Sequence, residues 1–187
     1  MAEERRLWNA WDSTIPAEEW KSVEEWAAVA VRYRAAADRG NVDAQFMLAC
    51  MLDDGWGVPV DAAAAVALYQ AAAAQGDNEA RGMLGEMLAN GRGIEMDEAA
   101  AVVHLREAAA AGDAFAQGWY GVMLRDGRGV EQDSASALAQ FQLAVAQGAF
   151  AANISAQIGP GACPILRIIS SRAGSRCLHR ASVGPVS

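Results

Sequence analysis

The sequence predicts an all-α protein: an α-solenoid of stacked antiparallel helix pairs, built from about three and a half repeats of 36 residues. Three observations predict it. Four glycines stand 36 residues apart: Gly40, Gly76, Gly112 and Gly148. Four alanines keep the same spacing: Ala44, Ala80, Ala116 and Ala152. A G-x-G-[VI] turn recurs three times, beginning at positions 55, 91 and 127. Self-similarity at such a period is typical of helical arrays, in which each unit buries its apolar face against its neighbours.

Each unit reads as two helices joined by the glycine turn. In the first helix the apolar residues fall at i, i+4, i+7 and i+8, as in Ala44, Leu48, Met51 and Leu52, which is a helical spacing. The second helix is expected to run for about 14 residues and to carry one large residue on its buried face: Tyr69, Leu105 or Phe141. Polar residues suited to N-caps precede both kinds of helix: Asn41, Asp77 and Asp113 for the first, and Asp61, Asp97 and Asp133 for the second. The second helix should end at the periodic glycine, which can adopt a left-handed conformation.

This pattern resembles the Sel-one-like repeat (SLR), a relative of the tetratricopeptide repeat. The matching stretches are "AQFMLACMLDDGWGVPVDAAAAVALYQAAAAQGD" (44–77), "ARGMLGEMLANGRGIEMDEAAAVVHLREAAAAGD" (80–113) and "AQGWYGVMLRDGRGVEQDSASALAQFQLAVAQG" (116–148). The glycine turn, the aspartate after it and the closing A-A-x-x-G carry the resemblance, which covers about residues 25–150. It implies a curved solenoid that serves as a non-enzymatic adaptor in protein complexes.

The two ends depart from the repeat. Residues 1–24 form a tryptophan-rich segment, and one capping helix is expected from about Ala17 to Asp38, after Pro16. Four tryptophans near the N-terminus are expected to cover the end of the stack, with docking of a partner as the alternative: Trp8, Trp11, Trp20 and Trp26. The array itself is expected over 25–152, as a leading half-unit followed by units near 41–76, 77–112 and 113–148.

The fourth copy starts with Gly148 and Ala152 and then fails, because Cys163-Pro164-Ile165 stands where the glycine turn should be. Residues 153–187 are rich in Ser, Gly and Pro and contain four arginines and no acid, which predicts a disordered basic tail. A shifted reading frame is one hypothesis for this change. If neither alternative frame of the gene continues the repeat past Ala152, that hypothesis fails.

The glycine turns do not fit known ligand sites. A dinucleotide fingerprint needs a third glycine and a preceding strand, and a P-loop needs a lysine, but Lys21 is the only lysine in the chain. A calcium loop aligned on Gly127 would place Val122 and Leu124 at ligand positions. The remaining candidates for zinc, Cys163, Cys177 and His179, have an unusual spacing and supply three ligands. The sequence therefore predicts no catalytic, cofactor-binding or metal site, and no cofactor.

Composition narrows the class of partner. All 23 acidic residues lie in the first 150 positions, and this acidic body is expected to repel nucleic acid. No apolar run approaches the length of a membrane helix and the N-terminus lacks the apolar core of a secretory signal, so a cytoplasmic protein is expected. Three cysteines are too few and too irregular for a disulfide framework.

What remains is the surface of the first helices, which in stacked helix pairs line the concave side. The positions that vary most between units nominate partner-binding residues that would form an apolar stripe edged by a carboxylate: Phe46, Met47, Cys50, Met83, Glu86, Trp119 and Val122. The alternative is that Met47, Met83 and Trp119 pack between neighbouring units.

The sequence therefore predicts an adaptor or scaffold that binds a peptide or helix of another protein. Two alternatives stay open. One is a small repeat-based hydrolase of the β-lactamase kind, although the cysteine pairs of such proteins are missing and His104 is the only histidine in the array. The other is a truncated or frameshifted piece of a longer repeat regulator.

Overall fold

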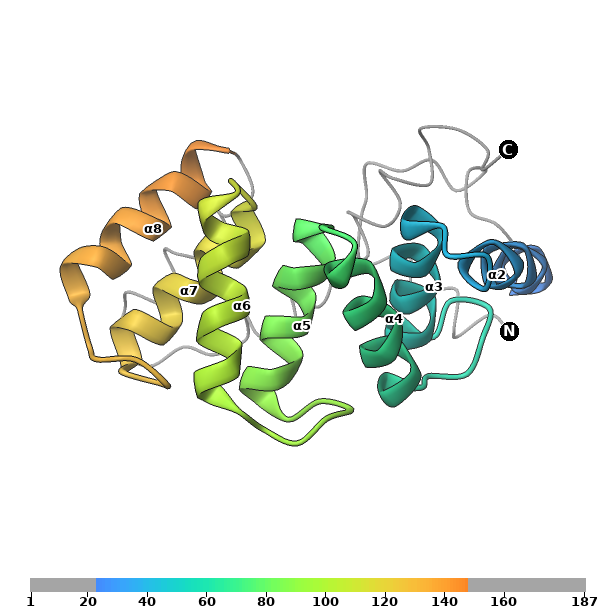
Figure 1. Ribbon diagram of the computed structural model, residues 1–187, viewed down its shortest axis with the longest axis horizontal. Coiled ribbons are helices and arrows are strands. Elements are labelled where there is room, and N and C mark those ends of the chain that lie inside the picture. Colours follow the sequence, from blue (N-terminus) through green and yellow to red (C-terminus); the bar gives the residue numbers. More distant parts are fainter. Residues whose placement is uncertain (1–22, 148–187) are drawn as a thin grey trace.

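The computed structural model describes residues 23–147, and within them the chain folds into α-helices alone. The helices follow one another along the long axis of the molecule (Figure 1). Their bounds are α2 Val23–Ala37, α3 Val42–Asp54, α4 Ala62–Ala74, α5 Asn78–Asn90, α6 Glu98–Ala110, α7 Ala114–Asp126 and α8 Ser134–Ala146. The predicted all-α solenoid is confirmed. The expected helix from Ala17 is described from Val23 onward, and Trp8, Trp11, Trp20 and the tail lie outside the described residues.

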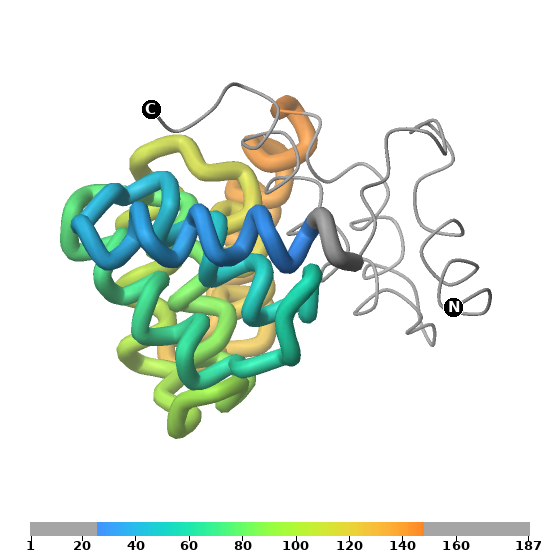
Figure 2. Tube along the Cα trace, turned by 90° about the vertical axis from the view of Figure 1, so that its right-hand side faces the viewer, coloured from blue at the N-terminus to red at the C-terminus, as the bar shows by residue number. Residues whose placement is uncertain are grey.

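The chain forms three helix pairs: α3 with α4, α5 with α6, and α7 with α8. Each second helix also packs against the first helix of the next pair, α4 against α5 and α6 against α7. The leading half-unit is α2, which packs on α3 and lies across that end of the stack (Figure 2). Each first helix is thus held between two second helices.

The predicted caps are confirmed. Each first helix has a cap whose Oδ1 atom accepts a hydrogen bond from the amide three residues on, at 2.8 Å for Asn41, 3.0 Å for Asp77 and 2.7 Å for Asp113. Each second helix is capped in the same way by Asp61, Asp97 or Asp133. These bonds satisfy backbone donors that the first turn of a helix leaves without a partner. The glycine that ends each first helix adopts a positive φ, +67° at Gly91.

In the core of the second and third units, one large side chain from the second helix packs against a glycine of the first helix. Tyr69, Leu105 and Phe141 are buried, as predicted. A Cβ atom added to Gly121 would lie 2.7 Å from Cε1 of Phe141, and one added to Gly85 would lie 2.7 Å from Cγ of Leu105. The small residue lets the two helices approach, because real Cβ atoms do not tolerate such distances.

The second glycine of the turn joins one unit to the unit before it. A Cβ atom on Gly93 would lie 2.4 Å from the carbonyl carbon of Ala62, in the first turn of α4. The equivalent atom on Gly57 would lie 2.4 Å from the backbone of Trp26, and on Gly129 it would lie 2.2 Å from the carbonyl oxygen of Glu98. These three contacts repeat with the period of the sequence, and each glycine turn therefore rests on the second helix of the preceding unit.

Candidate functional site: the first-helix side

The residues that the sequence nominates for partner binding lie on the three first helices, and most of them are buried. Buried side chains are Phe46, Met47, Cys50, Met83, Glu86 and Trp119, whereas Val122 is half-buried. Of the two interpretations, packing within the stack describes the positions of Met47, Met83 and Trp119, which belong to the main hydrophobic core. Contact of these residues with a partner stays a prediction.

Aromatic contacts hold two of these residues in place. The ring of Phe46 meets that of Tyr69 edge-on, with centroids 5.8 Å apart, and the Tyr69 hydroxyl lies 3.5 Å from Sγ of Cys50. On α7 the rings of Phe115 and Trp119 lie 6.4 Å apart. Such geometries favour aromatic pairs beyond the area they bury. The Nε1 atom of Trp119 is buried and has no hydrogen-bond partner.

An ion cluster connects the first unit to the second. The guanidinium of Arg92, in the second glycine turn, contacts Asp53 at the end of α3 and Glu86 on α5. The Nδ2 atom of Asn90 donates to Glu86 Oε1 at 2.8 Å. Both carboxylates are largely buried, and Arg92 supplies their compensating charge. Sequence reasoning named only Glu86 from this cluster, because Asp53 and Arg92 are 39 residues apart along the chain.

The same cluster perturbs a neighbouring carboxyl group. Burial, followed by the charge of Asp53, raises the pKa of Asp54 to about 7, and Arg92 opposes this shift. The Oδ2 atom of Asp54 is buried without a hydrogen-bond partner. Burial also raises the pKa of Tyr69, so its hydroxyl remains neutral and able to donate.

Arg92 illustrates a rule for the middle residue of each turn, which contacts the preceding unit in all three copies. In the first turn this residue is Trp56, whose ring packs against that of Trp26 on α2 at 5.7 Å. In the third it is Arg128, whose Nε donates to Glu98 at 2.6 Å and whose Nη2 donates to the Ala89 carbonyl. Ala89 occupies the repeat position of Asp53. At this position the arginine of the following turn bonds to a side-chain carboxylate in the first unit and to a backbone carbonyl in the second unit.

A second link crosses each junction at the start of the first helix. A side-chain donor at one repeat position reaches a carbonyl near the end of the preceding second helix: Gln45 to Ala37 at 3.4 Å, Arg81 to Ala73 at 3.3 Å and Gln117 to Ala109 at 3.3 Å. The Nε2 atom of Gln75 donates to Oε1 of Gln45, and that of Gln147 donates to Oε1 of Gln117. These bonds connect the end of the second helix to the start of the first helix in the first and third units.

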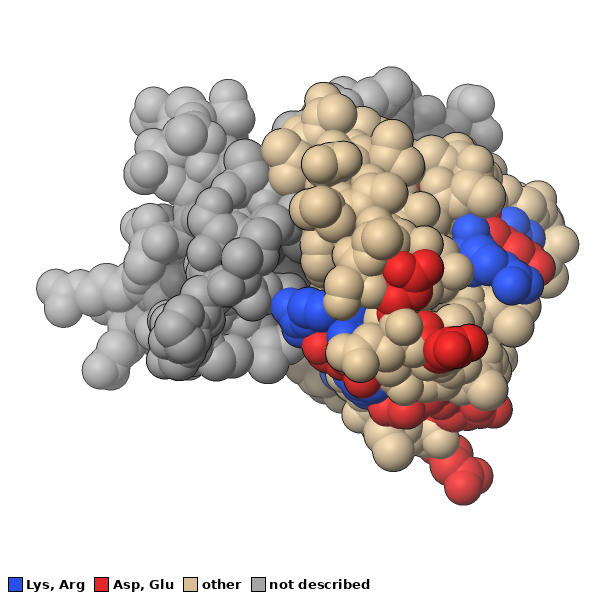
Figure 3. All heavy atoms as spheres, turned by 90° about the vertical axis from the view of Figure 1, so that its left-hand side faces the viewer, with Lys and Arg blue, Asp and Glu red and all other residues tan. Residues whose placement is uncertain are grey.

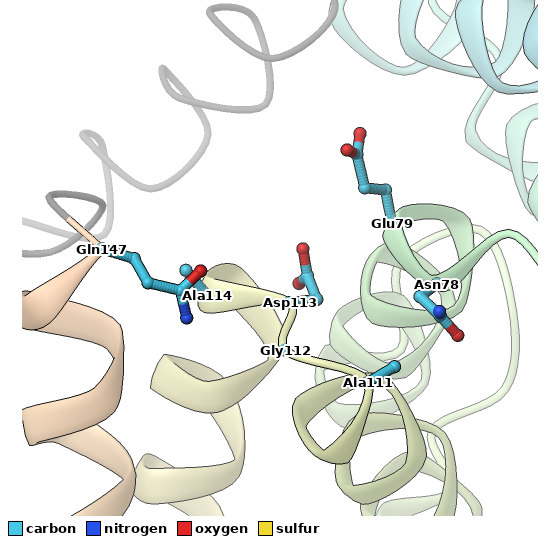
Figure 4. Close-up of a pocket in the computed structure, with 7 residues that line it drawn as sticks. All are labelled: Asn78, Glu79, Ala111, Gly112, Asp113, Ala114 and Gln147. Carbon is cyan, nitrogen blue, oxygen red and sulfur yellow. The ribbon is translucent and has the colours of Figure 1, made fainter.

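An open hollow of about 390 Å³ lies where the second and third units meet. It is lined by the first turn of α5, the connection between α6 and α7, and Gln147 (Figure 4). Its carboxylates come from Glu79 and Asp113, and the latter already caps α7. The hollow thus exposes acceptor groups at a unit boundary and encloses no cavity.

The described residues also bear on catalysis and membranes. His104 is half-buried on α6, where burial lowers its pKa. Within residues 23–147 we find no cluster of three or more His, Cys, Asp or Glu side chains suited to a metal ion. In the same part of the chain, every helix is too short or too polar to span a membrane.

Two solved structures share this architecture. A protective antigen of uropathogenic Escherichia coli, c5321, which displays an SLR fold, is 35% identical with a TM-score of 0.59. A Sel1 repeat protein from Oxalobacter formigenes is 25% identical with a TM-score of 0.62. The alignments cover 62% and 66% of this chain, but 25% and 49% of those proteins, so the chain spans a quarter to a half of their lengths. No curated protein is similar to it in sequence.

The repeat itself identifies the family. The pattern of the Sel1 repeat matches three consecutive segments, residues 42–77, 78–113 and 114–148, which together make up more than half of the chain. Their boundaries fall where α3, α5 and α7 begin. The chain therefore belongs to the Sel1 repeat family.

Proposed function

We propose that this protein is a non-enzymatic adaptor that binds a peptide or helix of another protein along the side formed by α3, α5 and α7. Sel1 repeat proteins are generally scaffolds for protein interactions and typically lack enzymatic activity, which supports an adaptor role.

One observation carries the choice of this side. The first helices of the second and third units, α5 and α7, contact each other directly. Each of them also contacts α6, the second helix that lies between them in sequence. Helices that approach their counterparts in this way lie toward the inside of a curved stack, where extended ligands dock in solenoids.

The accessible groups on this side suggest the chemistry of the partner. Asp54, Asn90 and Asp126 share one repeat position at the ends of the first helices, and all three side chains are exposed or half-buried. Val122 adds a half-buried apolar surface one turn before Asp126. This combination fits a partner segment that carries hydrogen-bond donors or positive charge beside an apolar residue. Beneath this face would lie the buried residues that the sequence predicted to bind a partner: Phe46, Met47, Cys50, Met83 and Trp119. Glu86, held by Arg92, would lie at its edge.

A site-specific photo-crosslinker would test the proposal. We would place it in the full chain at Val122 and, as the matched control, at Val103, an exposed valine on the second helix α6. Crosslinking to a partner from Val122 and not from Val103 is expected. Crosslinks from Val103 alone, or equally from both sites, would refute binding on the first-helix side.

A further inference from the structure

Asn90 is the only asparagine of the chain that a glycine follows. It is the last residue of α5, it is exposed, and Gly91 begins the second glycine turn. An asparagine side chain can react with the backbone nitrogen of the next residue, and a glycine leaves that nitrogen unshielded because it has no Cβ atom. Asparagine is among the thermolabile residues for this reason. The sequence therefore places a reactive pair of residues between the first and second units.

The reaction consumes water and releases ammonia. The Gly91 nitrogen loses its proton to base in the solvent and bonds to Cγ of Asn90, the bond from Cγ to Nδ2 breaks, and Nδ2 takes up a proton and leaves as ammonia. The product is a cyclic imide that contains the Gly91 nitrogen. Water then breaks either the new bond to Cγ, which gives aspartate, or the original bond to the backbone carbonyl carbon, which gives isoaspartate.

Both reacting groups are engaged in the folded chain. The N–H of Gly91 donates to the carbonyl of Met87, and Gly91 caps α5 with a φ of +67°. The Nδ2 atom of Asn90 donates to the backbone carbonyl of Glu86 at 3.1 Å and to its Oε1 atom at 2.8 Å. These bonds must break before the Gly91 nitrogen can reach Cγ. The closed cap therefore protects Asn90.

The bonds that protect Asn90 belong to the junction between the units. Oε1 of Glu86 accepts from Asn90, and its Oε2 contacts Arg92, which also contacts Asp53 on α3. Gly93, in the same turn, lies against α4 with no room for a Cβ atom. If the turn lifts from the first unit, Glu86 loses its hold on Arg92 and the end of α5 is freed with it. The reactivity of Asn90 is therefore coupled to local opening of this junction.

We propose that Asn90 is a modification site: its deamidation records opening of the junction between the first and second units, and the product keeps that junction weakened. The reaction is slow while the cap on α5 is closed and proceeds when the turn lifts from α4. Because ammonia is lost to the solvent, closing the junction again does not restore the amide. No partner protein is required for this change.

An aspartate at position 90 would oppose Glu86 directly. The two positions are four residues apart on α5, where like charges destabilise a helix, and the donor of the 2.8 Å hydrogen bond would be lost. The other units avoid this conflict. Asp54 and Asp126 occupy the same repeat position, but the residues one turn before them are Cys50 and Val122. An amide at position 90 is therefore matched to the glutamate at position 86.

The charge of the array adds to this effect. All 23 acidic residues of the chain lie in its first 150 positions. Acidic side chains also gather along the lower part of the face at the α8 end (Figure 3). A further carboxylate therefore increases the self-repulsion of an array that is already negative.

Isoaspartate would act on the turn itself. It routes the backbone through Cγ and so adds a carbon atom to the chain between α5 and Gly91. The turn that follows fits closely, because a Cβ atom on Gly93 would lie 2.4 Å from the carbonyl carbon of Ala62. A longer backbone displaces Gly93 from this position, so both products weaken the same junction.

The rate of deamidation in the full chain tests the protection by the fold. The chain would be incubated in mildly alkaline buffer, either folded or unfolded in guanidinium chloride, and the products at position 90 followed by peptide mapping with mass spectrometry. We expect the folded chain to react more slowly by about tenfold or more, because only opened molecules react.

A variant of the junction tests the coupling. Each folded rate is divided by the rate of the same variant when unfolded, which removes any effect of charge on the reaction itself. Arg92→Met should raise this ratio by about fivefold or more, because it destabilises the junction. Arg125→Met, the matched control in the third unit, should change it by less than about twofold. If Arg92→Met does not fold, Arg92→Lys takes its place, since lysine lacks the planar fork that contacts both carboxylates.

Thermal unfolding tests the effect of the product. Asn90→Asp should lower Tm by about 3 °C or more at neutral pH, through the lost hydrogen bond and the like charge. In the Glu86→Gln background the same substitution should lower Tm by clearly less, because the opposing charge is gone. Asp126→Asn, the control at the same repeat position, should change Tm by about 1 °C or less.

Any of three results would overturn the proposal. The first is a folded chain that deamidates at position 90 as fast as the unfolded chain, or an unfolded chain that does not react there. The second is a rate ratio that the Arg92 variant leaves unchanged. The third is an Asn90→Asp chain as stable as the parent, or one whose loss of stability is the same with glutamine at position 86.

Discussion

Gly129 lies against the first turn of α6 so closely that a Cβ atom on it would stand 2.2 Å from the carbonyl oxygen of Glu98. Gly93 and Gly57 approach the preceding unit in the same way. The glycine turn is therefore a contact between units as well as a change in chain direction.

A methyl group on Gly129 should destabilise the array more than one on a glycine that only turns the chain. Gly112 is the matched control, because it also has positive φ but a Cβ atom added to it would meet nothing within 4 Å. We expect Gly112→Ala to cost about 1 kcal/mol from backbone strain and Gly129→Ala about 2–4 kcal/mol, since overpacking is added. Urea unfolding would measure both values, and equal costs would contradict the close-approach role.

Removing the guanidinium of Arg92 should destabilise the junction between the first two units. Arg92→Met leaves Asp53 and Glu86 buried without a compensating charge, at an expected cost of about 1–3 kcal/mol, given that Arg92 is itself partly exposed. Arg125→Met is the control, because Arg125 pairs with its exposed neighbour Asp126 and should cost less than about 1 kcal/mol. Urea unfolding curves compare the two, and similar losses would show that the Arg92 cluster has no special role.

Stability should respond to pH through Asp54. Its pKa is about 7 in the folded chain and about 4 when unfolded, so the folded state binds more protons between these values. Stability from this group is therefore gained on acidification and lost as pH rises toward 7, at no more than about 1.4 kcal/mol per pH unit. The lowered pKa of His104 acts in the opposite direction, because this imidazole is favoured in its neutral form.

The two effects can be separated by comparing the parent chain with Asp54→Asn in urea between pH 5 and 8. The variant should gain stability relative to the parent as pH rises, because it lacks the carboxylate that burial disfavours. A difference between the two curves that does not change with pH would rule out a buried, titrating Asp54.

The junction hydrogen bonds at Gln117 should make a smaller contribution. Gln117→Met removes the donor to the Ala109 carbonyl and the acceptor for Gln147 while preserving side-chain length. The expected cost is about 1–2 kcal/mol, and Gln142→Met, an exposed position on α8, should be within about 0.5 kcal/mol of the parent. Thermal or urea unfolding would show whether Gln117→Met exceeds this control.

Local features of the fold could be predicted from the sequence, because they depend on residues close together along the chain. Asp77 and Asp97 cap their helices as expected, and Tyr69 is buried as the helical period requires. Whether Met83 and Trp119 are buried or exposed could not be predicted, because it depends on how neighbouring units stack. In the structure both are buried.

The glycine turn likewise has features that could be predicted from the sequence and contacts that could not. Its repetition predicted both the fold and the positive φ of residues such as Gly91. The contact of Gly129 with Glu98 and of Arg92 with Asp53 involves residues 31 and 39 positions apart. The varying middle residue of the turn, Trp56, Arg92 or Arg128, was the one available indication of these junctions, and its meaning became clear only with its partners in place.

These junctions limit how such an array can change by recombination. Duplicating the second unit would place a new arginine opposite Glu98 and the Ala89 carbonyl, the two acceptors that Arg128 uses in the third turn, so this junction would be matched. If the sequence of the second turn replaced that of the first, an arginine would stand at position 56 and face Trp26 on α2. A unit therefore carries half of a matched pair at each end. The second unit can follow a copy of itself, whereas an exchange that involves the first turn must also move Trp26, the neighbour with which Trp56 is matched.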